Sequence, residues 1–153
     1  MKVRVLSYND FKQVLGASTI NDKTVKNFED TIFISILDTG TGWFSKRQFK
    51  EDHKNVLTLK FDDVTVDGES SPTNHFNTQA FTEKNAESIV TFLENNKNAS
   101  FCMIHCAAGI SRSGAIGQFI NDYFRGDYNE FRQMNPRTIP NQMIIRKLNK
   151  LMR

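Results

Sequence analysis

Several features of secreted, membrane-spanning and nucleic-acid-binding proteins are scarce in this sequence. Its two cysteines cannot form the disulfide framework of a small secreted domain. No stretch approaches the roughly 18–20 apolar residues of a membrane span, and the start, MKVRVLSYND, lacks the apolar segment of a signal peptide. A net charge of +3 is too small to indicate nucleic acid binding. We therefore expect a cytoplasmic protein with neither a membrane nor a nucleic acid as partner.

The composition is that of a folded domain of ordinary size. Hydrophobic residues make up 39% of the 153 residues and charged residues 24%, and thirteen residues are Phe. This is enough apolar material for a sizeable core. No internal repeat, linker or shift in composition divides the chain. The sequence predicts one domain that covers residues 1–153.

Short apolar runs that alternate with helical patterns predict an α/β fold. Runs at 2–6, 31–37, 55–61 and 101–104 have the length and composition of strands. The run 31–37 is apolar almost throughout, which is typical of a strand buried on both faces of a parallel sheet. We expect a central, mostly parallel sheet of about four or five strands, flanked by helices.

Capping residues and apolar periodicity predict the helices around this sheet. Ser7 is a candidate N-cap for a short helix that Gly16 ends, and Thr82 is a candidate N-cap for a helix ended by residues 95–98. Residues 49–54 suggest one helical turn. A short helix at 128–134 precedes a last amphipathic helix that starts at Pro140 and Asn141, with its apolar positions inside at Met143, Ile144, Ile145, Leu148 and Leu151.

The most informative stretch is FCMIHCAAGISRSGAIG, residues 101–117. It reads as a buried strand, a tight loop and the start of a helix. This arrangement points backbone N–H groups and the positive end of a helix dipole at one spot. Such a nest binds a tetrahedral anion such as phosphate. The predicted phosphate-binding residues are Ala107, Ala108, Gly109, Ile110, Ser111 and Arg112.

The residues at the two ends of this loop suggest catalysis. Cys106 opens the loop, and a thiol at a helix N-terminus beside a guanidinium is favoured as thiolate, the nucleophilic form. Arg112 closes the loop with a planar fork that can grip two phosphate oxygens. Gly109 lies where the backbone must bend. Ser113 can hydrogen-bond the thiolate when it is a leaving group, so we predict Cys106, Arg112 and Ser113 to be catalytic.

The other residues of this stretch have simpler explanations. Cysteine is often buried, so Cys106 alone would indicate packing, and only the complete loop favours a nucleophile. Cys102 lies inside the apolar run and is interpreted as structural. A disulfide between Cys102 and Cys106 is not expected, because four residues of extended strand span about 13 Å, which is beyond disulfide reach. His105 is interpreted as a residue that shapes the loop, with direct chemistry as the alternative.

The segment from His105 to Ser113 resembles the His-Cys-x5-Arg-Ser/Thr loop of the cysteine-dependent protein phosphatases. Within that superfamily it is most similar to the compact dual-specificity and tyrosine phosphatase branch. The break at 135–137 and the Pro-Asn start of the last helix also resemble that branch. The resemblance implies hydrolysis of phosphate monoesters of phosphorylated proteins or peptides through a phosphocysteine intermediate. It implies no metal and no cofactor, because Arg112 and the backbone amides supply the charge stabilisation.

The resemblance also implies an aspartate that protonates the leaving oxygen, positioned just after the preceding strand. The strand pattern at 57–61 leads into Asp62 and Asp63, and the family pattern favours Asp63. Asp62 would then cap the turn or disfavour ionisation of its neighbour by like-charge repulsion. The segment between Asp63 and Cys106 is longer than is usual in the compact members. Asp62, Asp67 and Glu69 therefore stay open as alternative acids.

Two further features bear on the substrate. Positions 107, 108 and 110 are Ala, Ala and Ile, so the loop lacks the lysines that lipid and inositol-phosphate phosphatases use for extra phosphates. Trp43 and Phe44 follow the strand 31–37, and we interpret them as satellite core rather than as the wall of a substrate pocket. The leading hypothesis is a phosphotyrosine phosphatase, with phosphoserine and phosphothreonine as further substrates. The alternative is a catalytically weak module that docks phosphorylated partners.

Overall fold

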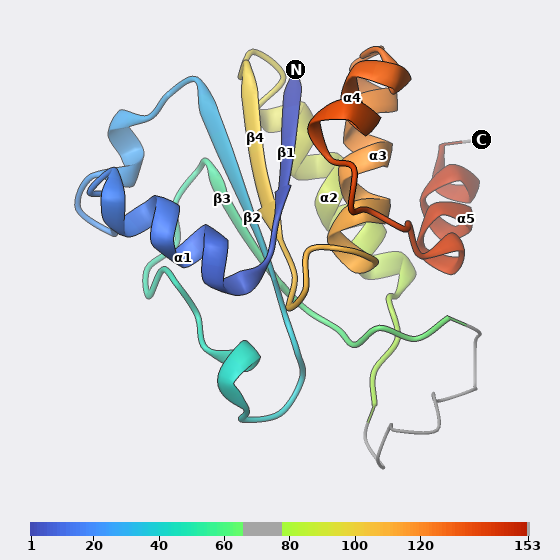
Figure 1. Cartoon of the computed structure of the whole chain (residues 1–153), viewed down its shortest axis with the longest axis horizontal. Helices are drawn as coiled ribbons and strands as arrows, with labels where there is room; N and C mark the ends of the chain where they lie inside the picture. Colours follow the sequence, from blue (N-terminus) through green and yellow to red (C-terminus); the bar gives the residue numbers. More distant parts are fainter. Residues whose placement is uncertain (66–77, 153) are drawn as a thin grey trace.

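The computed structural model describes residues 1–65 and 78–152, and its centre is a four-stranded parallel sheet. The strands are β1 (Lys2–Leu6), β2 (Thr31–Leu37), β3 (Val56–Lys60) and β4 (Phe101–His105), in the order β1-β4-β2-β3 (Figure 1). All three pairings are parallel. The predicted α/β fold is confirmed, and β4, which leads into the Cys106 loop, is an inner strand.

In the described part of the chain, five α-helices flank the sheet, and two short 3-10 helices lie in the connections. α1 covers one face, and α2 and α3 cover the other, with α5 packed against α2 and α3, and α4 beside α3 and β1 (Figure 1). No helix in the described part of the chain is long and apolar enough to cross a membrane. The helices are α1 (Tyr8–Ala17), η1 (Val25–Asn27), η2 (Trp43–Ser45), α2 (Glu83–Asn95), α3 (Arg112–Tyr123), α4 (Tyr128–Met134) and α5 (Gln142–Leu151).

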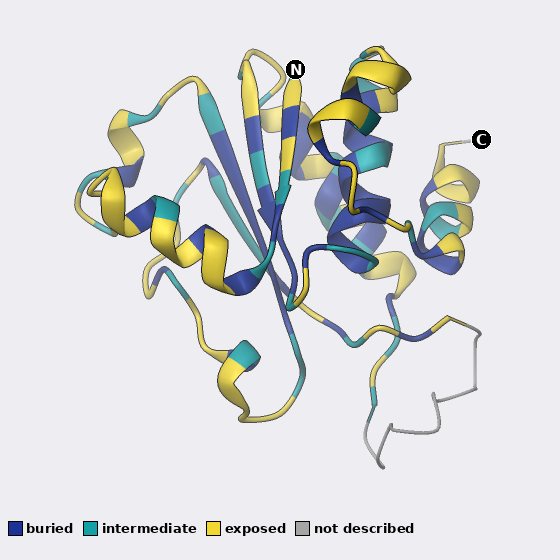
Figure 2. Cartoon of the chain, in the orientation of Figure 1, coloured by how far each residue is buried: buried dark blue, intermediate teal, exposed yellow. Residues whose placement is uncertain are grey.

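The side-chain alternation of β2 builds a core on each face of the sheet. Ile32, Ile34 and Ile36 pack into the larger core, toward α2, α3 and α5. Phe33 points to the opposite face and packs in the smaller core with Phe11 of α1. Six of the seven residues of β2 are buried, and Figure 2 shows the strand dark blue along most of its length. The prediction of a strand buried on both faces is confirmed.

Three local expectations were wrong. α1 continues through Gly16 to Ala17, and the chain turns only at Thr19, whose φ of 53° is left-handed. Residues 49–54 form bends and turns rather than a helical turn. Leu151 is 38% exposed, so the buried face of α5 ends at Leu148, before the last turn of the helix.

The parallel topology brings the carboxyl ends of all four strands to one edge of the sheet. The segments that leave this edge are residues 7–8 after β1, 38–45 after β2, 61–65 after β3 and 106–111 after β4. In open parallel sheets this is the edge at which ligands bind. The predicted site residues of the Cys106 loop therefore meet groups from three other connections.

Candidate functional site

The Cys106 thiol lies buried at the start of the loop and is held by hydrogen bonds. The side chain is 2% exposed, and the amide of Gly109 donates to Sγ at 3.3 Å. The hydroxyl of Ser113 lies 3.0 Å from Sγ. A sulfur between an amide donor and a hydroxyl is in the setting that a thiolate requires, both as an attacking and as a leaving group.

The loop is shaped by a glycine and by the connection after β1. Gly109 has a φ of +72°, and a Cβ there would lie 2.6 Å from backbone atoms of Leu6 and Ser7. Only glycine fits this conformation and this close approach without displacing backbone. The amide of Tyr8 donates to the carbonyl of Ala107 at 3.1 Å. The end of β1 and the start of α1 therefore hold the loop from behind.

The loop runs into α3 without a side-chain cap. Ser111 is the N-cap residue of this twelve-residue helix, yet its side chain makes no capping hydrogen bond. Its hydroxyl donates instead to Asp63, at 2.9 Å. The first N–H groups of a helix have no partner within the helix, so they remain directed at the loop, where an anion can accept from them.

Arg112, at the start of α3, is buried and held by two other connections. Its guanidinium Nη1 lies 2.7 Å from Asp38 Oδ1 and donates to the carbonyl of Phe61 at 2.9 Å. Both contacts use the same nitrogen. The other N–H groups of this side chain make no hydrogen bond within the described residues. They form the part of the fork that can bind an oxyanion.

His105, the last residue of β4, is fully buried and supports the loop from the α1 side of the sheet. Nδ1 lies 3.1 Å from the carbonyl of Cys106, which can only accept, so the proton is on Nδ1. Ser35 then donates to Nε2 at 2.5 Å. Burial lowers the pKa of His105 to about 4 despite the hydrogen bond to Cys106, so the ring is neutral at physiological pH. The geometry is that of a residue that shapes the loop.

Asp63 faces the loop, whereas its neighbour Asp62 does not. Asp63 Oδ1 accepts from Ser111 Oγ at 2.9 Å and from Asn141 Nδ2 at 2.8 Å. The structure thus brings Asp63 to the same loop as Cys106, Arg112 and Ser113. The amide of Asn141 also donates to the carbonyl of Val64, which ties the connection after β3 to the start of α5.

Asp62 caps the turn between the connections after β2 and β3. It accepts hydrogen bonds from the amides of Thr39 and Gln79, at 3.0 and 2.9 Å, and from the Thr39 hydroxyl. Burial acts to raise the pKa of Asp62, but these hydrogen bonds outweigh it, so the net pKa is lowered. The other alternative acids, Asp67 and Glu69, lie outside the described residues.

Cys102 and Trp43 also bear on expectations from the sequence. Cys102 is 1% exposed and unbridged, and burial strongly raises the pKa of its thiol, in agreement with a structural role. Trp43 is 53% exposed, so the interpretation as satellite core is wrong for this residue. The short 42–46 segment leaves its indole on the surface, and its ring contacts Tyr8 at an edge, with centroids 6.3 Å apart.

Sequence reasoning missed several groups that the structure places around the loop. The sequence predicts Asn141 only as the start of a helix, and it does not single out Asp38, Ser35 or Tyr8. The one available signal was the position of Asp38, because a carboxylate that directly follows a buried parallel strand lies at the ligand-binding edge.

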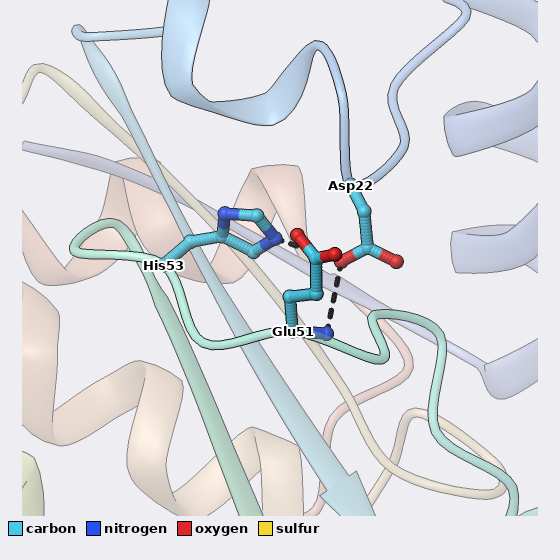
Figure 3. Close-up of side chains that lie close together, drawn as sticks. All are labelled: Asp22, Glu51 and His53. Atoms are coloured by element: carbon cyan, nitrogen blue, oxygen red, sulfur yellow. Dashed lines mark hydrogen bonds and ion pairs between the residues drawn. The ribbon is translucent and has the colours of Figure 1, made fainter.

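One cluster in the described residues has ligand types that can hold a metal. Asp22, Glu51 and His53 place one ligand atom each within 4.8 Å of one another (Figure 3). The Asp22 carboxylate already accepts from the amides of Lys50 and Glu51 and from His53 Nε2, at 3.0, 3.2 and 2.7 Å. The His53 hydrogen bond is the main reason why the pKa of Asp22 is lowered to about 2. These contacts fasten the connection after α1 to the segment before β3, away from the Cys106 loop.

Comparison with known proteins supports the fold. No model of a protein family matches the sequence, and no curated protein matches it. Among solved structures, the chain is similar to the active form of Tk-PTP, a protein tyrosine phosphatase. The match covers 99% of this chain and 91% of that one, with a TM-score of 0.50 and 19% sequence identity. At this identity the likeness shows a tyrosine-phosphatase-like fold and nothing finer.

Proposed function

We propose that the chain is a cysteine-based phosphatase that hydrolyses phosphotyrosine in proteins or peptides. The observation that carries the proposal is the meeting of four groups at one loop. Cys106 Sγ lies 3.0 Å from Ser113 Oγ, the Arg112 fork closes the loop, and Asp63 is hydrogen-bonded to Ser111 within it. A nucleophile, an anion cradle and an acid are the parts that phosphate-ester hydrolysis without a metal requires.

In the first step the ester phosphate lies in the nest of amides from Ala107 to Arg112. The Arg112 guanidinium follows the charge on the phosphate oxygens into the transition state. The Cys106 thiolate attacks phosphorus, so an S–P bond forms and the P–O bond to the substrate breaks. The leaving oxygen takes a proton from the Asp63 carboxylic acid.

In the second step water hydrolyses the phosphocysteine. The Asp63 carboxylate accepts a proton from the attacking water, and the new P–O bond displaces the thiolate. Ser113 stabilises the departing thiolate by hydrogen bonding at the 3.0 Å distance found between the two side chains. The net reaction converts the ester and water into the alcohol and inorganic phosphate, and Cys106 and Asp63 return to their starting states.

The loop also indicates the class of substrate. Ala107, Ala108 and Ile110 carry no charge, which favours a phosphate monoester on a protein over a highly phosphorylated lipid or inositol. We propose that residues 1–153 act as one catalytic domain in the cytoplasm, where thiols stay reduced. Phosphoserine and phosphothreonine peptides belong in the same assays, because pocket depth decides between tyrosine-only and dual specificity.

The test is hydrolysis of para-nitrophenyl phosphate under reducing conditions with a chelator present. Cys106→Ser is expected to abolish turnover, and Cys102→Ser, its matched control, is expected to retain it. Asp63→Asn is expected to lower kcat about a hundredfold, the scale of general acid catalysis, whereas Asp62→Asn changes stability more than chemistry.

Three results would contradict the proposal in different ways. Normal turnover in Asp63→Asn would move the acid to Asp62, Asp67 or Glu69. No turnover in the wild type, with vanadate or a phosphopeptide still bound at the loop, would favour the alternative of a module that docks phosphorylated partners. Retained turnover in Cys106→Ser would exclude the phosphocysteine route.

A further inference from the structure

Two lysine ammonium groups lie next to the exposed indole of Trp43, at the edge of the sheet where the strands end. Trp43 lies in η2, below the start of α1 in Figure 1, and is 53% exposed. Lys12 Nζ of α1 lies 5.0 Å from the centroid of the Trp43 ring, and Lys46 Nζ lies 5.3 Å from it. Both distances are within cation–π range. We call Lys12, Trp43 and Lys46 the cationic rim.

Tyr8 fixes the cationic rim to the catalytic loop. The amide of Tyr8 donates to the carbonyl of Ala107, and its hydroxyl donates to the carbonyl of Lys46 at 3.2 Å. The Tyr8 ring contacts the rings of both Trp43 and His105, at 6.3 and 5.5 Å between centroids. Because Tyr8 is 3% exposed, these contacts are held by the core. Tyr8 therefore holds the Trp43 ring and the Lys46 backbone close to the Cys106 loop.

The two ammonium groups have no anionic partner of their own. Neither Lys12 nor Lys46 forms an ion pair with a carboxylate among the described residues, and both side chains are exposed. Two like charges within about 5 Å of one ring centroid repel each other, and the indole offsets only part of this repulsion. A carboxylate that approaches either ammonium group gains from the positive potential of both, so the rim has the charge that favours an acidic side chain.

We propose that the cationic rim binds acidic side chains that flank the phosphorylated residue of a peptide substrate. The inference rests on the proposed function, because it assigns a second contact to the substrate of the same loop. Ring contacts of 5.5 and 6.3 Å in series lead from His105 through Tyr8 to Trp43. An extended peptide advances about 3.3 Å per residue, so an Asp or Glu a few residues from the phosphate reaches the rim.

The test compares two phosphotyrosine peptides, one flanked by Glu and one in which Gln replaces each Glu. The measured quantity is the ratio of their kcat/KM values for the same enzyme, which cancels any change common to both peptides. The wild type is expected to prefer the Glu peptide at low salt. The double variant with Lys12→Glu and Lys46→Glu is expected to lower the ratio about fivefold to tenfold, as for two exposed ion pairs made repulsive.

Matched variants distinguish a local effect of the rim from an effect of the net charge of the protein. Lys97→Glu makes the charge change of one of these two substitutions, at an exposed residue beyond the end of α2, and it is expected to keep the wild-type ratio, whereas Lys12→Glu alone is expected to lower it. Trp43→Ala is expected to weaken the preference, and Trp43→Phe to restore part of it, because Phe keeps a ring face for the lysines. Added salt is expected to reduce the preference in the wild type, since exposed charges are screened.

Failure of this inference is distinct from failure of the proposed function. If the wild type hydrolyses para-nitrophenyl phosphate but has equal kcat/KM for the two peptides, the proposed phosphatase activity stands and the proposed role of the cationic rim is wrong. An equal loss of preference in Lys97→Glu would overturn it as well, since the field would then be general. If the wild type turns over nothing, binding of the same peptides to Cys106→Ser decides the point: tighter binding of the Glu peptide supports the rim, and equal binding overturns it.

Discussion

Asp38 Oδ1 lies 2.7 Å from Nη1 of Arg112, so the arginine that closes the Cys106 loop is oriented by the connection after β2, the strand that pairs with β4. Asp38 directly follows β2, which pairs with β4 along its length. The carbonyl of Phe61, after β3, accepts from the same nitrogen. The connections after two neighbouring strands thus set the position of the guanidinium, and in the proposed reaction this fixed position would reduce the entropic cost of binding the transition state.

Loss of the Asp38 carboxylate is expected to impair catalysis more than folding. We expect Asp38→Ala to lower kcat/KM for para-nitrophenyl phosphate by tenfold to a hundredfold, because a misplacement of about 1 Å has effects of this size. Asp38→Asn keeps an acceptor oxygen and is expected to retain more activity. Steady-state kinetics and urea unfolding, measured on the same variants, separate the effect on catalysis from the effect on stability. Wild-type kcat/KM in Asp38→Ala would show that Phe61 alone suffices to orient Arg112.

Gly109 provides a test of the loop backbone. In Gly109→Ala the new Cβ meets backbone atoms of Leu6 and Ser7 at 2.6 Å, at a φ of +72°. We expect a loss of about 1–3 kcal/mol of stability together with weaker inhibition by phosphate and vanadate. Gly16→Ala is the control, because Gly16 lies within α1 with nothing within 4 Å of the added Cβ. It is expected to stabilise the protein by about 0.5–1 kcal/mol. Equal effects of the two substitutions would contradict the account of the loop.

The parts of this structure that could be predicted from the sequence are local in the chain. The stretch from Phe101 to Gly117 carries its strand, its loop and its helix start in consecutive residues, so periodicity and the glycine position predicted them. The strand 31–37 was predicted with its bounds as found, because it is apolar on both faces. The end of α1 was missed because a glycine at an exposed helix position is tolerated, and the left-handed residue proved to be Thr19.

The parts that could not be predicted are contacts between distant segments. Ser35 and His105 are 70 residues apart, and Asp63 and Asn141 are 78 apart. No periodicity or motif within one segment encodes such a pair, because it depends on strand order and on how α5 docks. The order β1-β4-β2-β3 makes β2 the neighbour of β4, which brings Asp38, directly after β2, within reach of Arg112.

Asn141 has two separable roles, which two substitutions can distinguish. Its Oδ1 caps α5 by accepting from Met143 and Ile144, and its Nδ2 donates to Asp63. Asn141→Ser keeps a capping oxygen but removes the amide donor, whereas Asn141→Ala removes both. We expect both variants to lower kcat for poor leaving groups more than for good ones, because Asp63 is then poorly held. Both variants lose the hydrogen bond to the Val64 carbonyl, and Asn141→Ala is expected to lose about 1 kcal/mol more than Asn141→Ser, because it also loses the cap.

The leaving-group series checks this assignment directly. A set of aryl phosphates with phenols of different acidity shows how far each enzyme depends on protonation of the leaving oxygen. A dependence equal to that of the wild type in Asn141→Ser would contradict a positioning role for the amide. Restored kcat in Asn141→Gln would support it, since the longer side chain keeps the donor.

The buried, neutral ring of His105 is expected to make the protein less stable in mild acid. Its pKa is lowered to about 4 in the folded state by burial, whereas an unfolded chain has a histidine pKa of about 6.5. The unfolded state therefore binds more protons between these values. The contribution of the neutral ring to stability is complete above about pH 6.5 and is lost as the pH falls toward 4. At about 1.4 kcal/mol for each pKa unit, the loss approaches about 3 kcal/mol.

Substitution by glutamine isolates this contribution from those of the acids. Gln cannot titrate, yet its amide can donate to the Cys106 carbonyl and its oxygen can accept from Ser35, as the ring does. Urea unfolding between pH 4.5 and 7.5 is expected to show a shallower pH dependence for His105→Gln than for the wild type. The same pH dependence in both proteins would mean that the buried ring is not the group that titrates. Because the ring hydrogen-bonds to the carbonyl of Cys106, we expect the wild type to lose vanadate affinity over the same pH range, as the loop loosens before the domain unfolds.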